Sequence, residues 1–248
     1  MIKNFVFVFI ACLGLQARAD GLGYQIMDEY KQSARLLGDR ESLTILGSGV
    51  AAVFAARLLD EEAQEHFSHQ HRLGSLEEIG NDYLGTGVPG ILLAGGFWVA
   101  GASFENEKAI RAGRAQFESL TATFVATSIL KGIGGRERPD GSDRYSFPSG
   151  HTSTVFASAS VLSRFYGWKA GVPAYFAGVV TALSRVSENR HWLSDTVSGA
   201  LVGELIGQAI ARAHLAQMQG DAADFTILPM LPFDGEDSRR GLAVRFAY

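Results

Sequence analysis

The sequence has little of what defines several classes of protein. Its 248 residues include one cysteine, Cys12, so a disulfide framework within the chain is excluded, and so is a thiolate metal site. Only 19% of the residues are charged, and 22 Lys and Arg stand against 26 Asp and Glu. This balance offers no excess of positive charge to hold a nucleic acid. The hydrophobic share of 47% excludes a disordered chain and is enough for one sizeable core.

The N-terminus has the three parts of a secretory signal peptide. Lys3 is followed by an apolar run over 5–15, and small residues stand at Ala17 and Ala19. Because the run is too short to span a bilayer permanently, we predict a signal peptide over 1–19 with cleavage after Ala19. The mature chain is then more negative and has no thiol. Its expected place is the periplasm or the periplasmic side of the cell envelope, and association with the inner membrane is left open.

Six apolar stretches of helical character follow, all rich in Ala, Gly, Ser and Val, which let helices approach closely. We therefore expect an all-α fold, a bundle of about six core helices in one domain over residues 20–215. Most stretches are interrupted by charged residues, and only Tyr83–Phe104 is long and uncharged enough to span a membrane. The number of membrane crossings stays open. The stretches cover residues 43–59, 84–103, 117–131, 151–165, 170–185 and 191–213.

Two further segments differ from this pattern. The polar connector over 60–82 contains His66, His69 and His71, a spacing that can bind a metal but that also suits a solvated segment. The last segment, 216–248, has alternating apolar and polar residues around a polar turn. This alternation predicts a short C-terminal tail of β-hairpin type.

Three clusters hold side chains suited to bind and transfer a phosphoryl group. The first joins Lys131 to Arg138 and Pro139 across a Gly-rich loop. A guanidinium fork can take two phosphate oxygens, and the lysine adds a flexible point charge. The second is Pro-Ser-Gly-His at 148–151, which opens a helix, where free backbone N–H groups attract anions.

The third cluster is Ser184-Arg185 followed by His191 and Asp195, which would share one face of a helix because they are four residues apart. Each cluster alone also has an ordinary structural explanation. Lys131 suits the last turn of a helix, and Ser149 suits an N-cap. Their conjunction, in one order and with these gaps, favours a phosphate site.

Together the three patterns resemble the signature of the type 2 phosphatidic acid phosphatase family, part of the superfamily of bacterial acid phosphatases and vanadium haloperoxidases. The resemblance covers about Lys131 to Gly207. It implies a helical bundle whose three motifs meet at one end. It also implies that His191 attacks phosphorus, that Asp195 holds the other ring nitrogen, and that His151 protonates the leaving oxygen. The residues implied to hold the phosphate oxygens are Lys131, Arg138, Ser149, Gly150 and Arg185.

The resemblance thus implies a phosphatase that needs no metal or other cofactor. Its expected substrates are lipid phosphates or diphosphates in the cell envelope, where it can contact the membrane. The first alternative is a non-specific acid phosphatase acting on small soluble phosphomonoesters. A vanadate-dependent haloperoxidase and a non-catalytic envelope protein that docks a partner through its tail are further alternatives. No nucleic-acid partner is expected, and the oligomeric state is not specified.

Overall fold

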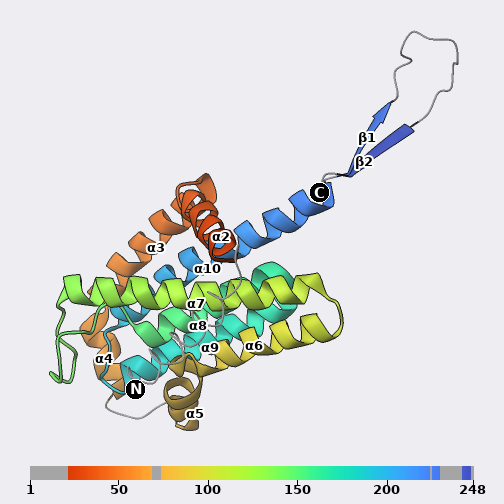
Figure 1. Cartoon of the computed structure of the whole chain (residues 1–248). Helices are drawn as coiled ribbons and strands as arrows, with labels where there is room; N and C mark the ends of the chain where they lie inside the picture. The colour runs from red at the N-terminus through yellow and green to blue at the C-terminus, as the bar shows by residue number, and fades with distance from the viewer. Residues whose placement is uncertain (1–21, 69–73, 224, 230–241, 247–248) are drawn as a thin grey trace, which may run out of the picture.

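The computed structural model describes residues 22–68, 74–223, 225–229 and 242–246. The predicted signal peptide lies outside these ranges. The described chain is helical almost throughout up to Ala223, which confirms the all-α prediction. Six helices longer than the others form the body in Figure 1, and each corresponds to one apolar stretch of the sequence. They are α3 (Arg40–Leu58), α6 (Val88–Ser103), α7 (Glu107–Gly134), α8 (Gly150–Tyr166), α9 (Trp168–Ser187) and α10 (Leu193–Ala223).

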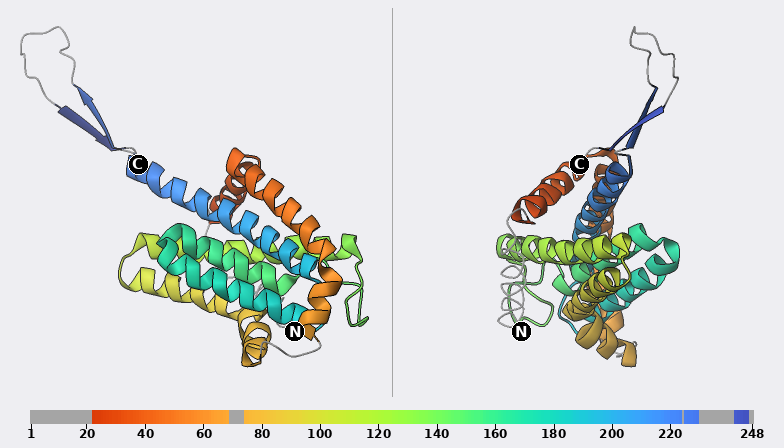
Figure 2. Two further views of the ribbon diagram at one scale, coloured as in Figure 1. Left: turned by 180° about the vertical axis from the view of Figure 1, so that it is seen from behind. Right: turned by 45° about the vertical axis from the view of Figure 1, so that its right-hand side comes forward.

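Shorter elements complete the fold. Helix α10 continues past residue 215, the domain boundary expected from the sequence, before the chain enters two strands that pair antiparallel. Figures 1 and 2 show these strands extending from the end of α10, away from the helices. The turn between them lies outside the described residues, so the hairpin as a whole stays a prediction. The shorter elements are α2 (Leu22–Leu36), α4 (Asp60–Ser68), α5 (Ser75–Glu78), η1 (Ile79–Tyr83), η2 (Leu84–Thr86), β1 (Phe225–Pro229) and β2 (Leu242–Phe246).

Local signals set where α7 begins and ends. The side chain of Asn106 caps the helix by accepting a hydrogen bond from the backbone N–H of Ala109. The helix ends where Gly135 takes a positive φ of 52°, a conformation that glycine adopts without steric cost. The chain then turns into the loop 136–149. Lys131, in the last turn of α7, is thereby placed at the edge of this loop.

Helices α8 and α10 pack unusually closely because glycines of α10 face α8. A Cβ atom on Gly199 would lie 2.4 Å from the carbonyl oxygen of Ser149, and one on Gly203 would lie 2.2 Å from that of Ser153. Only glycine permits this approach. The two helix beginnings therefore meet, and the backbone N–H of Ser149 donates to the carbonyl of Asp195 at 2.9 Å.

Helix α3 is long and apolar enough to cross a membrane, by length and composition alone. The prediction that only Tyr83–Phe104 reaches this length is therefore wrong, because the charged residues of α3, among them Arg57, lie near its ends and leave its middle apolar. The Tyr83–Phe104 stretch is itself divided. A bend of 53° at Gly87 separates residues 75–86 from α6, and the two parts reach the required length only if counted as one span.

Candidate active site

The structure brings the three sequence clusters together at one end of the bundle. Lys131 lies in the last turn of α7, His151 in the first turn of α8, and Arg185 in the last turn of α9. Asp195 lies in the first turn of α10. The positive charges of Lys131, Arg138 and Arg185 all act on the two predicted active-site histidines. One compact group of side chains therefore contains all three clusters.

His191 is buried between a cation and a carboxylate, with 2% of its surface exposed. Its Nε2 lies 3.4 Å from Nη1 of Arg138, and its Nδ1 lies 3.8 Å from Oδ2 of Asp195. The second distance is too long for a hydrogen bond, and Nδ1 has no hydrogen-bond partner. His191 also precedes α10 and does not lie in it, so the pair meets at the helix beginning and not along one helical face.

Asp195 is fully buried and held by three other donors. Its carboxylate accepts hydrogen bonds from the hydroxyl of Ser146, from the backbone N–H of Trp192 at 3.0 Å and from Nη1 of Arg136 at 2.5 Å. Burial works to raise the pKa of Asp195, but the nearby His191 ring, the hydrogen bond from Ser146 and the charge of Arg136 hold that pKa below its ordinary value. The group is therefore a fixed carboxylate at neutral pH.

Both histidines are poor bases. Burial, together with the nearby positive charges, lowers the pKa of His191 to about 4 and that of His151 to about 3. Both imidazoles are therefore neutral at neutral pH. An anion bound among the cations would offset the charges that lower these two pKa values.

Two of the predicted phosphate-binding cations contact the loop 136–149. Nζ of Lys131 donates to the carbonyl of Tyr145 at 2.5 Å, and burial lowers the pKa of this lysine to about 8. Arg138 donates from Nε to Asp143 at 2.7 Å and from Nη1 to the carbonyl of Arg190 at 2.8 Å. These contacts fix the direction of the guanidinium group beside His191.

The third cation, Arg185, is buried and incompletely paired. Its Nη1 donates to Asn81 of η1 and, at 2.7 Å, to Glu188. Its Nε has no hydrogen-bond partner, although it is buried. Burial lowers the pKa of Arg185 to about 10 in spite of the charge of Glu188, so the side chain keeps its positive charge at neutral pH. This buried N–H is therefore available to donate a hydrogen bond to a bound anion.

Ser149 and Gly150 form the beginning of α8. The hydroxyl of Ser149 accepts hydrogen bonds from the backbone N–H of Thr152 at 3.5 Å and from the Thr152 hydroxyl at 3.0 Å. The structural role of Ser149 as N-cap is therefore confirmed. Around Gly150 the nearest atom that an added Cβ would meet is Cε of Lys131, at 3.9 Å. The space beside this glycine therefore opens toward a cation of the cluster.

Several residues of this site were missed by sequence reasoning. Asn81 and Gly85 come from the connector before α6, and a Cβ on Gly85 would lie 2.5 Å from Cδ2 of His151. Arg136, from the loop, donates to Asp195, and Asp60 of α4 accepts a hydrogen bond from this arginine. The pair of arginines spaced two apart in a Gly-rich loop was the one available signal for Arg136. The others sit in segments without a motif.

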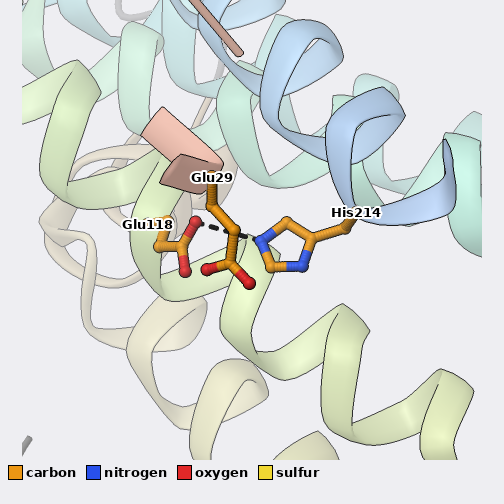
Figure 3. Close-up of side chains that lie close together, drawn as sticks. All are labelled: Glu29, Glu118 and His214. Carbon is orange, nitrogen blue, oxygen red and sulfur yellow. Dashed lines mark hydrogen bonds and ion pairs between the residues drawn. The ribbon is translucent and has the colours of Figure 1, made fainter. Parts of the chain in front are cut away.

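One group of histidine and carboxylate side chains in the described residues is close enough to bind a metal, and it contains no predicted site residue. Glu29, Glu118 and His214 have ligand atoms within 4.8 Å of one another. Figure 3 shows them converging from three helices, with Nε2 of His214 and Glu118 3.0 Å apart. Of the histidines in the polar connector, His66 is not part of this group, and His69 and His71 lie outside the described residues.

Comparison with known families gives a match over residues 140–219, to the profile of the PAP2 superfamily. The matched range includes the second and third clusters. The chain contains a PAP2 superfamily domain. This match confirms the resemblance to the type 2 phosphatidic acid phosphatases. Lys131 and Arg138, in the first cluster, precede the matched range.

The chain is similar to parts of known proteins. It is 46% identical over 77 residues to the lipid A 1-phosphatase of Porphyromonas gingivalis, a match that covers 30% of this chain and 17% of the relative. It is 31% identical over 100 residues to a putative phosphatidate phosphatase of Drosophila melanogaster, covering 36% of this chain and 26% of the relative. The chain thus spans less than a third of either relative.

Two solved structures resemble the fold. A PAP2 type phosphatidylglycerolphosphate phosphatase from Bacillus subtilis matches with a TM-score of 0.45 and 18% identity, over 79% of this chain and 96% of that one. LpxE of Aquifex aeolicus matches with a TM-score of 0.40 and 20% identity, over 56% of this chain and 93% of that one.

Proposed function

We propose that the chain is a metal-independent phosphatase of the cell envelope that hydrolyses phosphomonoesters, with lipid phosphates or diphosphates as its favoured substrates. The observation that carries this proposal is the arrangement around His191. One of its ring nitrogens faces Arg138, beside the other cations of the cluster, and the other faces the fixed carboxylate of Asp195. A buried neutral imidazole in this position is an activated nucleophile for phosphorus.

The first step forms a phosphohistidine. The lone pair on Nε2 of His191 attacks phosphorus while the bond from phosphorus to the leaving oxygen breaks, and His151 supplies the proton that this oxygen needs. The charge of Asp195 stabilises the imidazolium that develops on His191. Lys131, Arg138 and Arg185 stabilise the negative charge on the equatorial phosphate oxygens, together with the Ser149 hydroxyl and the Gly150 backbone N–H.

The second step releases phosphate. A water molecule attacks phosphorus, and its proton passes to His151, which lost a proton in the first step. The bond between phosphorus and Nε2 breaks, and His191 returns to its neutral form. Proton transfer by a positioned group of this kind contributes about 10²- to 10⁴-fold to the rate. The low pKa of His151 in the empty site means that bound phosphate must raise it before the first step.

An apolar cavity beside His151 supports a lipid substrate over a small soluble one. Its volume is about 250 Å³, and it lies between η2, α6, α8 and α9. Two residues of its lining place the cavity near His151. Leu84 directly precedes Gly85, which contacts the His151 ring, and Thr154 lies one turn of α8 after His151. An alkyl chain of a substrate whose phosphate lies at His191 can enter here. The lining includes Leu84, Leu93, Thr154, Val155, Leu162, Ala174 and Ala177.

The activity is tested with the purified chain on p-nitrophenyl phosphate and on a phosphatidic acid, each compared with His191→Ala. We expect hydrolysis of both by the wild type and a loss of at least about 10³-fold in the variant, because the nucleophile is missing. Added EDTA should leave the rate unchanged. Equal rates for wild type and variant on both compounds would overturn the proposal, and bromide oxidation by vanadate-loaded protein without hydrolysis would favour a haloperoxidase.

The lipid preference is tested by filling the cavity with Ala177→Phe. We expect kcat/KM for a long-chain lipid phosphate to fall about tenfold, because each methylene excluded from an apolar site costs ~0.8 kcal/mol. Hydrolysis of p-nitrophenyl phosphate should stay within twofold, which also shows that the variant is folded. Val179→Phe, on the exposed side of α9, is the matched control. An equal effect of Ala177→Phe on both substrates would favour a soluble phosphomonoester.

A further inference from the structure

Asp195 depends on an arginine that belongs to none of the three motifs. Nη1 of Arg136 donates to Oδ1 of Asp195 at 2.5 Å and to the hydroxyl of Ser194 at 2.7 Å. The guanidinium also lies over the ring of Trp192, 5.3 Å from its centroid. Since Oδ1 is held from this side, the other carboxylate oxygen, Oδ2, stays on the side of His191.

Arg136 is itself held by a second buried carboxylate, that of Asp60 at the beginning of α4. Asp60 is 1% exposed and accepts from Nη2 of Arg136 at 2.7 Å. It also accepts from the backbone N–H and the hydroxyl of Ser194, both at 2.8 Å. Ser194 directly precedes Asp195 in the chain. Asp60 therefore fixes both the arginine and the backbone of the first turn of α10.

A guanidinium fork suits this task better than an ammonium group. Arg136 contacts Asp60 with one terminal nitrogen and Asp195 with the other, and a lysine could reach only one of them. Without this cation Asp195 would be a buried carboxylate that has lost its arginine partner, which is costly. The arginine thus lets Asp195 remain an ionised carboxylate in one fixed position.

We propose that Arg136 and Asp60 are positioning residues that hold Asp195 in place behind His191, so that the imidazole attacks phosphorus in a single orientation. The inference rests on the proposed function, because the attack by His191 is part of it. It adds two residues that are not among the specified positions of the motifs: Arg136 lies between Lys131 and Arg138, and Asp60 is more than 70 positions before the nearest motif. Neither side chain touches the substrate in this arrangement.

The inference is tested by measuring kcat and KM for p-nitrophenyl phosphate in Arg136→Gln, Arg136→Lys and Asp60→Asn. We expect kcat to fall about 10- to 100-fold in Arg136→Gln, the size typical of lost support for a functional group, with KM within twofold. Arg136→Lys should lie between this variant and the wild type. The double variant with Asp60→Asn should lose less activity than the product of the two single losses, because part of the effect of Asp60 passes through the arginine.

Arg57→Gln is the matched control. Arg57 donates to the same oxygen of Asp60 at 2.8 Å, but its side chain is 61% exposed and it has no contact with Asp195. We expect its kcat to stay within twofold of the wild type. A fall equal to that of Arg136→Gln would mean that any disturbance of Asp60 lowers activity, which would overturn the assigned role of Arg136.

A readout that does not need turnover separates this inference from the proposed function. The pKa of His191, followed by NMR of its ring, should rise in Arg136→Gln, because a positive charge beside the Asp195–His191 pair is then removed. If the wild type shows no hydrolysis that depends on His191, the proposed function fails while this shift still tests the network. Unchanged kcat and unchanged pKa in folded Arg136→Gln would overturn the inference, and so would a rise in KM alone. If Arg136→Gln does not fold, a wild-type kcat in Arg136→Lys overturns it.

Discussion

At the scale of single residues, charge decides the state of the two histidines. Burial and three cations leave His151 and His191 neutral in the empty site. The proposed reaction needs His191 neutral but His151 protonated. A bound phosphate dianion resolves this conflict, because His151 can regain a proton once negative charge lies among the cations. We therefore expect substrate binding and proton uptake to be coupled in this site.

The coupling can be measured with a ligand that does not itself titrate. We expect NMR titration to give His151 a pKa below 5 in the free protein and a value at least about one unit higher in saturating sulfate, as for a group that gains an opposite charge. Arg138→Gln should weaken sulfate binding and reduce the shift. A pKa of His151 that is the same with and without sulfate would contradict the coupling.

The pKa of Lys131 gives a second consequence for activity. Because burial lowers this pKa to about 8, the ammonium loses its proton as the pH rises through 8 and phosphate loses one of its cations. We expect KM for p-nitrophenyl phosphate to rise several-fold between pH 7 and pH 9, with a smaller change in kcat. The control is Lys131→Arg, whose guanidinium stays charged and should show no rise in KM over this range.

Sequence reasoning at this scale was successful where residues form contiguous patterns. The three clusters can be read from spacing, and the structure brings their side chains together. Arg136, Asp60 and Asn81 could not be predicted, because their roles come from contacts across the fold and not from neighbours in sequence. The distance of 3.8 Å between His191 and Asp195 also depends on where α10 begins, which the spacing alone does not give.

At the scale of helices, glycines decide how close the motif-bearing elements lie. Gly203→Ala would place a Cβ 2.2 Å from a backbone oxygen of α8. We expect the free energy of unfolding to fall by roughly 1–3 kcal/mol, as for an overpacked core, with a marked loss of activity as α8 and α10 move apart. Gly47→Ala on α3 is the control. A Cβ there meets no atom within 4 Å, so denaturation should show a gain of up to about 1 kcal/mol.

The buried group in Figure 3 joins α2, α7 and α10 and makes their packing sensitive to pH. Burial raises the pKa of Glu118 to about 7, so this carboxyl keeps its proton in the folded protein while the unfolded chain loses it. Its contribution to stability is present below about pH 4.5 and is lost as the pH rises through about 7. Glu118→Gln should therefore gain a few degrees in Tm relative to wild type between pH 5 and pH 8. An equal Tm difference at both pH values would contradict this.

The order of the helices was predictable because each is an apolar stretch with polar borders. The bend at Gly87 was missed, although Gly85, Gly87 and Pro89 within the apolar run are signals for a new helix beginning there. The end of α10 was also predicted too early. The residues after 215 have helix propensities that allow the helix to continue to Ala223.

At the scale of the whole molecule, apolar residues remain on the outside of several long helices. Phe54 and Leu58 of α3 are 70% and 86% exposed, and Phe176 of α9 is 65% exposed. Large exposed apolar areas are typical of surfaces that contact a membrane or a partner. They support the proposed membrane association, which the sequence alone left open.

Membrane association can be tested by fractionation of cells that make the tagged chain. We expect it in the membrane pellet after a carbonate wash, and we expect Phe54→Ser with Leu58→Ser to move a measurable share into the soluble fraction while the protein stays active on p-nitrophenyl phosphate. Tyr145→Ser, which removes an exposed aromatic ring from the loop, is the control. Full release of the wild type by carbonate would contradict stable association.

The segment before α6 has a consequence for how such enzymes diversify. Asn81 and Gly85 contact Arg185 and His151, yet both lie outside the range shared with the superfamily profile. The predicted catalytic residues and the residues that contact them therefore lie in separate stretches of the sequence. Substitutions in these contacting residues can change which substrates bind without changing the catalytic residues. Sequence similarity over the motif range alone is therefore a poor guide to the substrates of such proteins.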